Sequence, residues 1–269
     1  VDVEEVGQGE ALVRLASAID SEWLPAERLT TAVEIEFDAQ RERIIAWRRT
    51  RYFDLVIRQS PSAIPPNIDP GPILAAGIRD RFGDDWQPAD ADLAFLARVK
   101  LLRQAMGELE LPDFGSRPFN SWLDELCVGQ VSLADVRKRS LAAIWKSHLS
   151  GEQLQALERH APERMRVPSG SFIALRYESG KPPVLAVRIQ EIFGWRETPR
   201  IAQGRVAVLL HLLAPNQRPQ QITGDLESFW ANTYPEVRKE LRRRYPKHAW
   251  PENPWAAQAE KRPRRKPGE

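Results

Sequence analysis

The sequence predicts an α+β protein in which strand-rich and helix-rich segments follow one another along the chain. Apolar and charged residues alternate in two stretches, one around Ile35 and one around Leu175, with the period of a half-buried strand. Between these stretches the apolar residues recur at helical spacing. A length of 269 residues suggests two or three domains, and a hydrophobic content of 42% is ordinary for a globular protein.

Residues 1–66 are expected to be β-rich. A first strand is predicted by the alternating residues Val33, Ile35 and Phe37. After turn-forming residues at positions 38–40, an extended stretch over residues 43–58 carries apolar residues of one parity: Ile45, Trp47, Phe53, Leu55 and Ile57. At least two paired strands are therefore expected. Five prolines between Pro61 and Pro72 predict a loop that ends this segment.

Residues 67–165 are expected to form a bundle of four or five helices. One amphipathic helix is predicted by apolar residues at spacings of four, three and four: Phe95, Val99, Leu102 and Met106. Ser132 and Asp135 resemble a capping box, and the helix that they begin is expected to run through Leu149. Ser150 and Gln153 repeat this signal for a short helix that ends before Pro162.

Residues 166–224 are expected to return to strands. Ile173, Leu175 and Tyr177 predict one strand, residues 184–189 a second, and Ser179-Gly180 the turn between them. The run from Arg205 to Leu213 is almost continuously apolar, which predicts a strand that is buried on both faces.

Residues 225–269 are expected to form a basic helix and a tail. Thr233 and Glu236 have the spacing of a capping box, and Pro246 ends the helix. Its apolar stripe is expected to consist of Val237, Leu241 and Tyr245. The tail beyond Pro254 is rich in Pro, Arg and Lys and is expected to be disordered.

The charge of the chain is unevenly distributed. The formal net charge is +2. However, residues 231–269 contain 11 Lys and Arg against 5 Asp and Glu, a local charge of +6, so the preceding residues carry −4. A basic end on an acidic body is typical of a protein that meets nucleic acid or another polyanion, although a solvated tail without a partner has the same composition.

Catalytic and metal-binding motifs are not found in the sequence. A phosphate-binding P-loop fails at Gly180-Lys181, because Pro182 follows where Ser or Thr is needed. The four histidines lie far apart without Cys or Glu at ligand spacing, and Cys127 is expected to be buried and inert. Asp124 and Glu125 resemble the acidic box of nucleotide hydrolases, but the residues before them are typical of a helix rather than of the buried strand that precedes such a box. The chain alone is therefore expected to be non-catalytic, with no cofactor and no metal.

No apolar run is long enough to cross a membrane and no signal peptide begins the chain, so a cytoplasmic location without membrane contact is expected. The chain begins with Val rather than Met, as expected of a processed chain or of a piece of a longer protein.

Two groups of basic residues are candidates for binding single-stranded nucleic acid. Arg48, Arg49 and Arg51 are interleaved with aromatic residues in an extended stretch, an arrangement in which bases stack while cations follow the phosphates. Charge that protects an edge strand is the structural alternative. The second group lies on the predicted C-terminal helix and consists of Arg238, Lys239, Arg242, Arg243 and Lys247. Its alternative is a solvated charged face.

Several segments resemble one known family, the bacterial HrpB family of DEAH-box ATP-dependent helicases. The run Phe229–Pro254, with FWANTYPEVRKELRRRYPKHAWPENP, is similar to the C-terminal signature of that family, although Asn253 stands where Asp is expected. Val167–Ser171, Gln190–Trp195 and Leu209–Pro215 are similar as well, and residues 15–20 with the strands over 34–58 resemble the region that follows the helicase motor. The resemblance is loose between Asp69 and Leu149.

The resemblance implies an intact protein in which two RecA-like domains bind and hydrolyse Mg-ATP and act on nucleic acid, most often RNA. No P-loop or DEAH box occurs in this chain, so it is expected to be a C-terminal accessory region that contacts RNA and docks on that motor. A scaffold that binds the motor or another protein without binding nucleic acid is the alternative.

With this resemblance, the predicted fold is an OB-like β domain (1–66), a helical middle domain (67–165), a second small β barrel or sheet (166–224) and a C-terminal basic helix with its tail (225–269).

Overall fold

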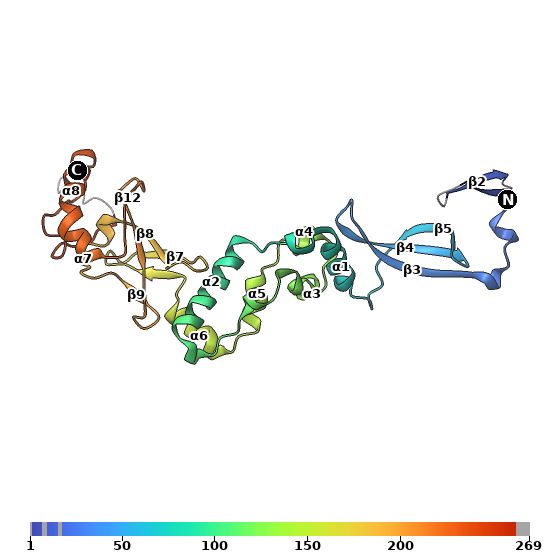
Figure 1. Ribbon diagram of the computed structural model, residues 1–269, viewed down its shortest axis with the longest axis horizontal. Coiled ribbons are helices and arrows are strands. Elements are labelled where there is room, and N and C mark those ends of the chain that lie inside the picture. Colours follow the sequence, from blue (N-terminus) through green and yellow to red (C-terminus); the bar gives the residue numbers. More distant parts are fainter. Residues whose placement is uncertain (1, 7–9, 16–17, 262–269) are drawn as a thin grey trace, which may run out of the picture. The chain divides into compact units, whose positions relative to one another are not determined.

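The computed structural model describes residues 2–6, 10–15 and 18–261, and its secondary structure is mixed α and β, as the sequence predicts (Figure 1). Its residues group into two compact units. Unit 1 contains the chain up to Asp85 together with Trp122–Arg139, and unit 2 contains Trp86–Ser121 together with the chain from Ser140 onward. The division into four domains stays a prediction.

Unit 1 is built on a three-stranded antiparallel sheet. Its strands are β3 (Leu29–Asp38), β4 (Arg43–Tyr52) and β5 (Leu55–Ser62), in that order, and they lie side by side in Figure 1. A separate antiparallel hairpin is formed by β1 (Asp2–Val6) and β2 (Glu10–Leu15).

The expected pairing of at least two strands in this region is confirmed, but the extended stretch over residues 43–58 is divided into two strands. The chain reverses at Phe53-Asp54, and Tyr52 on β4 pairs with Leu55 on β5. The apolar residues that share one parity do not share a buried face, since Leu55 and Ile57 are exposed while Ile44 and Ala46 of the other parity are buried. The two-residue turn exchanges the parity of the sheet faces, and a register shift between Thr50 and Arg51 restores it further along, so one parity does not describe both strands.

The described part of unit 1 also contains three α-helices, α1 (Gly71–Phe82), α3 (Leu123–Cys127) and α4 (Leu133–Val136), and a 3₁₀ turn follows α1 at Gly83–Asp85. Helix α1 lies close to β3, because a Cβ at Gly77 would overlap the ring of Phe37. The Asp69 carboxylate accepts hydrogen bonds from Gly71 N at 2.9 Å and Gly129 N at 3.0 Å, which ties the start of α1 to the segment after α3.

The helix expected from Ser132 through Leu149 is two helices. Ser132 caps only the short α4, and Ser140 caps a new helix, α5 (Leu141–Ser147). The Asp92 carboxylate fixes this second start, since it accepts from Ser140 Oγ at 2.7 Å and from Ala142 N at 2.9 Å. The prediction failed because Ser140 is itself a good N-cap residue within the expected helix.

The helices of unit 2 confirm two predictions. Helix α2 (Asp90–Ala105) and its C-cap bury all four predicted apolar residues, Phe95, Val99, Leu102 and Met106. Helix α6 (Gly151–His160) begins with the predicted capping box of Ser150 and Gln153. The ring of Trp145 on α5 stacks between Phe95 and Phe114 at centroid distances of 6.3 and 5.8 Å.

A five-stranded sheet dominates the rest of unit 2. Its strands are β6 (Arg164–Arg166), β7 (Phe172–Arg176), β8 (Val184–Arg188), β11 (Leu209–Leu213) and β12 (Pro219–Thr223), in the order β12-β11-β8-β7-β6. Strands β8 and β11 are parallel, and the other neighbours are antiparallel. Leu185, Val187, Leu210 and Leu212 point to one face and are buried.

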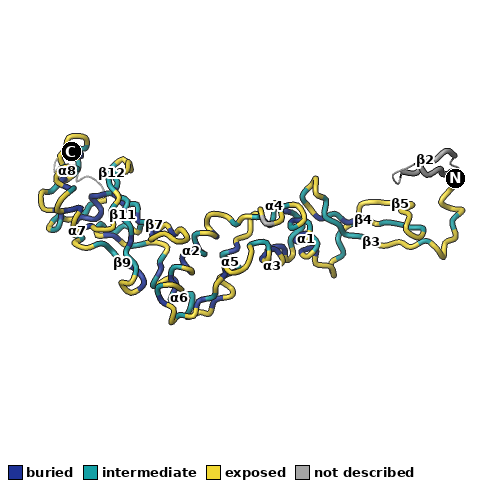
Figure 2. Tube along the Cα trace, in the orientation of Figure 1, coloured by how far each residue is buried: buried dark blue, intermediate teal, exposed yellow. Residues whose placement is uncertain are grey.

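The run from Arg205 to Leu213 is not one strand buried on both faces. It divides into β10 (Val206–Ala207), which pairs with β9 (Arg200–Ile201), and β11. On β11 only Leu210 and Leu212 are buried, while the alternate residues are half-buried. Figure 2 shows this mixture of buried and intermediate residues in the sheet.

The C-terminal helix begins earlier than expected. Asp225, rather than Thr233, is the N-cap, and the helical path runs through α7 (Leu226–Ser228) and a π-helical turn at Phe229–Thr233 into α8 (Tyr234–Arg244). Thr233 makes no side-chain capping bond, because the preceding turn already occupies that position.

The expectation of a disordered tail beyond Pro254 is corrected for residues 255–261. Glu260 N donates to Gln190 O at 2.9 Å, and Lys261 O accepts from Arg188 at 3.1 Å. Residues 262–269 lie outside the described residues. Among the helices of the described ranges, none is long and apolar enough to cross a membrane.

Candidate nucleic-acid interface

The arginines of β4 do not form one surface. Successive side chains of a strand alternate between the two faces, so Arg49 and Arg51 share one face while Arg48 lies on the other. Arg48 pairs in register with Val33 and Ser60, is exposed, and makes no ion pair within the described residues.

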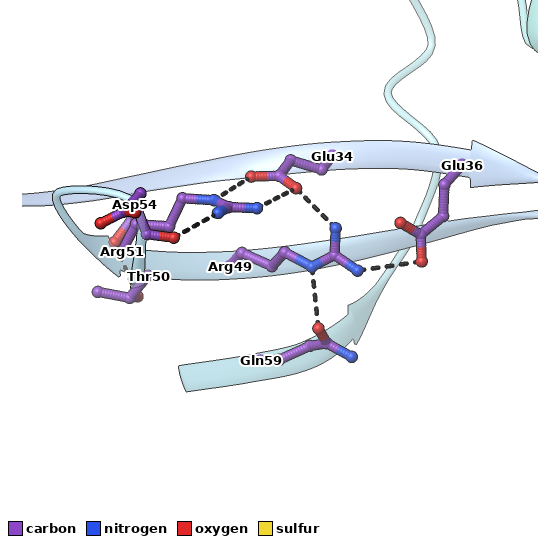
Figure 3. Close-up of polar contacts among 8 residues, drawn as sticks. Glu34, Glu36, Arg49, Thr50, Arg51, Asp54 and Gln59 are labelled. Atoms are coloured by element: carbon purple, nitrogen blue, oxygen red, sulfur yellow. Dashed lines mark hydrogen bonds and ion pairs between the residues drawn. The ribbon is translucent and has the colours of Figure 1, made fainter. Parts of the chain in front are cut away.

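Arg49 and Arg51 are held by carboxylates of β3 (Figure 3). Arg51 donates to both carboxylate oxygens of Glu34, at 2.7 and 3.0 Å. Arg49 donates to Glu34 at 2.7 Å, to Glu36 at 3.0 Å and to the side chain of Gln59 on β5 at 2.9 Å. Only 15% of the Arg49 side chain is exposed. The positive charge of these two residues is therefore largely offset within the sheet.

Glu34 is the centre of this ion-pair network. Hydrogen bonds from Arg51 and then from Arg49 lower the pKa of its carboxyl group to about 2. The carboxylate stays ionised under all ordinary conditions, and it competes with any phosphate for the two guanidinium groups. Glu34 and Glu36 were visible in the sequence as polar members of an alternating strand, but the pattern does not show which basic residues lie opposite them.

Helix α8 is fixed to the body of unit 2 by aromatic residues. Trp230 lies 5.9 Å from Phe193 and 5.1 Å from Tyr234, measured between ring centroids. Tyr234 Oη donates to Pro251 O at 3.0 Å, and Leu241 is fully buried. Of the predicted apolar stripe, Leu241 is buried, and Val237 and Tyr245 are half-buried. Charged residues on the outer side of α8 are thus presented from a rigid support.

Two of the predicted basic residues of α8 are engaged within the chain. Arg238 donates to Trp250 O at 2.8 Å and to the Glu252 carboxylate at 2.9 Å, which holds the segment after the helix against it. Lys239 forms an exposed ion pair with Glu236 at 2.7 Å.

The other three are available. Arg242, Arg243 and Lys247 are exposed, and within residues 18–261 none of them forms an ion pair or a side-chain hydrogen bond. Arg242 and Arg243 lie in the last turn of α8, where the helix dipole favours positive charge, and Lys247 lies in the turn that follows the helix.

Other candidates in the sequence do not form a second site. Among residues that the structure describes, no three His, Cys, Asp or Glu side chains gather as metal ligands. Cys127 is buried, and desolvation raises the pKa of its thiol to about 11, which fits the expectation that it is inert. Asp124 lies in the first turn of α3 and pairs with Arg79, and the element directly before this helix is a 3₁₀ turn rather than a strand.

Comparison with known proteins identifies relatives of the chain. The family described as "ATP-dependent helicase C-terminal" (HrpB_C) matches residues 122–254. The ATP-dependent RNA helicase HrpB of Escherichia coli K12 is 36% identical over 228 residues, which are 82% of this chain and 28% of that protein.

Solved structures agree with this relationship. A crystal structure of the E. coli DExH-box NTPase HrpB superimposes with a TM-score of 0.66 and 34% identity, over 87% of this chain and 29% of that one. A crystal structure of the E. coli DEAH/RHA helicase HrpB gives a TM-score of 0.58 and 33% identity, over 86% of this chain and 30% of that one. This chain therefore spans less than a third of the length of these relatives.

Proposed function

Because this chain is homologous to the C-terminal region of the HrpB ATP-dependent helicases, we propose that it is an accessory region that contacts single-stranded RNA for a helicase motor. In this proposal the RecA-like motor lies outside the 269 residues and binds and hydrolyses Mg-ATP, and the chain itself holds no cofactor. A cytoplasmic location belongs to the same proposal.

One observation supports the RNA contact most directly: the three exposed cations at the end of α8 have no carboxylate partner within the described residues. Phosphates can therefore bind Arg242, Arg243 and Lys247 without first breaking an internal ion pair. Arg48 on the sheet of unit 1 is also exposed and forms no ion pair within the described residues, so it too can bind a phosphate without breaking an internal contact. Arg49, Arg51 and Arg238 are expected to contribute less, because each would have to leave a carboxylate.

The experiment is fluorescence anisotropy of labelled single-stranded RNA over a series of salt concentrations. Replacement of all three residues (Arg242→Ala, Arg243→Ala, Lys247→Ala) is expected to weaken binding and to reduce the slope of log K against log salt by about 2, since each single-strand phosphate contact contributes about 0.7. Lys239→Ala is the matched control, because Glu236 already offsets the charge of Lys239. Binding by the triple variant with an unchanged slope contradicts the proposal.

A specific observation also favours docking on the motor. Strand β5 is an edge of the described sheet, and the turn before it and its first half expose four large apolar side chains: Phe53 (61%), Leu55 (62%), Val56 (44%) and Ile57 (38%). Edge strands of monomeric proteins are normally protected by charge, and clustered exposed apolar residues mark interaction surfaces. A scaffold role without RNA binding needs only this surface.

Docking is tested by mixing the chain with a separately produced motor region of its own protein and following the mass by light scattering. We expect a complex that is lost on substitution of Leu55→Ser and Ile57→Ser and retained by the α8 triple variant. A complex that forms equally with the β5 variant contradicts this surface. If the complex forms while RNA does not bind, the scaffold role replaces the RNA-contact role.

A further inference from the structure

The five-stranded sheet of unit 2 has an open face at its β6–β7 edge. Residues that point to this face are Arg164 and Arg166 of β6 and Phe172, Ala174 and Arg176 of β7, and all five are exposed. We call them the β6–β7 surface. The opposite face of β7 and β8 carries Leu175 and Leu185, which are buried, so the two faces of the sheet are clearly distinguished.

An aromatic ring on this surface is flanked by cations. Phe172 has 58% of its surface exposed. Arg166 lies directly opposite Phe172 in the strand register, and Arg164 donates from Nη2 to Phe172 O at 2.7 Å, so its side chain runs toward the same residue. Directly paired residues have their Cβ atoms about 5 Å apart. Arg176 lies four residues further along β7 on the same face.

The arginines of the β6–β7 surface form no ion pair with the nearest acidic residues of the described chain, although the charge of Arg176 adds to that of Lys181 in lowering the pKa of the Glu178 carboxyl group. Glu163 pairs with Arg98 at 2.7 Å, and Glu178 pairs with Lys181 at 2.6 Å. Within the described residues, Arg166 and Arg176 make no ion pair, and Arg164 bonds only to a backbone carbonyl. Arg188, on the same face of β8, differs because Glu191 offsets its charge at 2.7 Å.

The same face continues across the sheet without acidic residues. Register pairing places on it Val184 and Ala186 of β8, His211 of β11 and Ile222 of β12. Ile222 is 55% exposed, which shows that this face is open at both edges of the sheet. An open sheet face with an exposed ring and arginines that form no ion pair at its β6–β7 edge is complementary to a polyanion that carries flat bases.

We propose that the β6–β7 surface binds single-stranded RNA, with one base stacked on Phe172 and the adjacent phosphates on Arg164, Arg166 and Arg176. This inference rests on the proposed function and adds a site whose affinity for RNA depends on a base that stacks on Phe172. The proposed contacts of α8, by contrast, are with phosphates only. The exposed Phe172 ring between the arginines favours a nucleic acid over an acidic protein, because a base can stack on the ring while the adjacent phosphates meet the cations.

The test compares two ligands, oligouridylate and an abasic oligomer of equal length, in anisotropy titrations with the 269-residue chain. The Phe172→Leu variant keeps an apolar side chain and removes the aromatic ring. We expect the preference for oligouridylate over the abasic oligomer to fall about tenfold in this variant, as for the loss of one stacking contact. Phe172→Tyr is expected to retain the preference. The control is Ile222→Ala, which removes an exposed apolar side chain at the other edge of the same face.

The charged residues are tested separately. Arg166→Gln with Arg176→Gln is expected to reduce the salt slope by about 1.4 for both ligands, because two phosphate contacts are lost. Circular dichroism confirms that each variant is folded.

The outcomes separate this inference from the proposed function. Wild-type binding with an unchanged preference in Phe172→Leu overturns the β6–β7 surface and leaves the contact through α8 standing. A preference that falls equally in Ile222→Ala also overturns it. If the wild-type chain binds neither oligomer, both proposals fail. The α8 triple variant is expected to lower the affinity for both oligomers by the same factor, because it removes phosphate contacts alone.

Discussion

Arginines of equal formal charge differ in this protein in how much of that charge reaches solvent. Arg49 and Arg51 face Glu34 across the β3–β4 pair, whereas Arg242 and Arg243 face solvent on α8. Arg238 belongs to the first kind, since it holds Trp250 O and Glu252. A charge count along the chain therefore overstates the cationic surface of β4 and of the second turn of α8.

The Glu34 network predicts a pH dependence of stability. The pKa of Glu34 is about 2 in the folded chain and lies below its value in the unfolded chain, about 4.3. Its stabilisation is therefore fully present above the unfolded value and is lost as the pH falls through the folded value. We expect Glu34→Gln to lower the denaturant midpoint at neutral pH, and the difference from wild type to shrink between about pH 4.5 and pH 2.

Urea titrations at several pH values measure this difference, with the exposed Glu22→Gln as the control. A difference between wild type and Glu34→Gln that stays constant down to pH 2 would show that the ion pairs with Arg49 and Arg51 do not stabilise the fold.

At the scale of single elements, the clearest signals in this sequence are the serines that mark where helices begin. Three serines, Ser132, Ser140 and Ser150, each accept a hydrogen bond from a backbone N–H in the first turn of a helix. The sequence identified Ser132 and Ser150, and missed Ser140 because a Ser inside an apolar periodic segment does not by itself end a helix. Only the packing of Asp92 against this point shows that a new helix begins there.

Removal of one of these caps has a defined cost. Ser150→Ala is expected to reduce the free energy of unfolding by about 1 kcal/mol, because it removes the bond to Gln153 N and half of the capping box. The control is Ser147→Ala, where the hydroxyl bonds to the carbonyl of Ile144 near the end of α5 and the expected change is within about 0.5 kcal/mol. Denaturant unfolding followed by circular dichroism compares the two, and equal effects of both substitutions would contradict the capping role.

Periodicity was a good guide where one element extends over several turns, as in α2, where all four predicted positions are buried. It failed where a turn of two residues separates strands, as at Phe53-Asp54, because the faces exchange parity there. The β6–β7 surface was missed for a related reason. Arg164 and Arg166 on β6 are separated by a loop from Phe172 and Arg176 on β7, so only strand pairing brings the four residues to one face.

At the scale of the whole chain, the two units are not continuous in sequence. Trp122–Arg139 belongs with the first unit although Trp86–Ser121 before it belongs with the second. Backbone hydrogen bonds make this return specific, with Ile44 N donating to Val131 O at 2.8 Å and Leu133 N to Glu42 O at 2.9 Å. Loop lengths and proline positions contain no information on such long-range pairing.

Local sequence was enough to assign the mixed α and β composition, the amphipathic α2, the capping box of α6, the basic C-terminal helix and the relationship to HrpB. These properties depend on spacing within one element or on similarity of residues in order. Tertiary structure alone decided which arginines are free. Arg49 and Glu34 are 15 residues apart in the chain, and Arg166 and Phe172 meet only through strand pairing. The availability of a charge depends on what lies across the sheet from it, and that neighbour comes from another part of the chain.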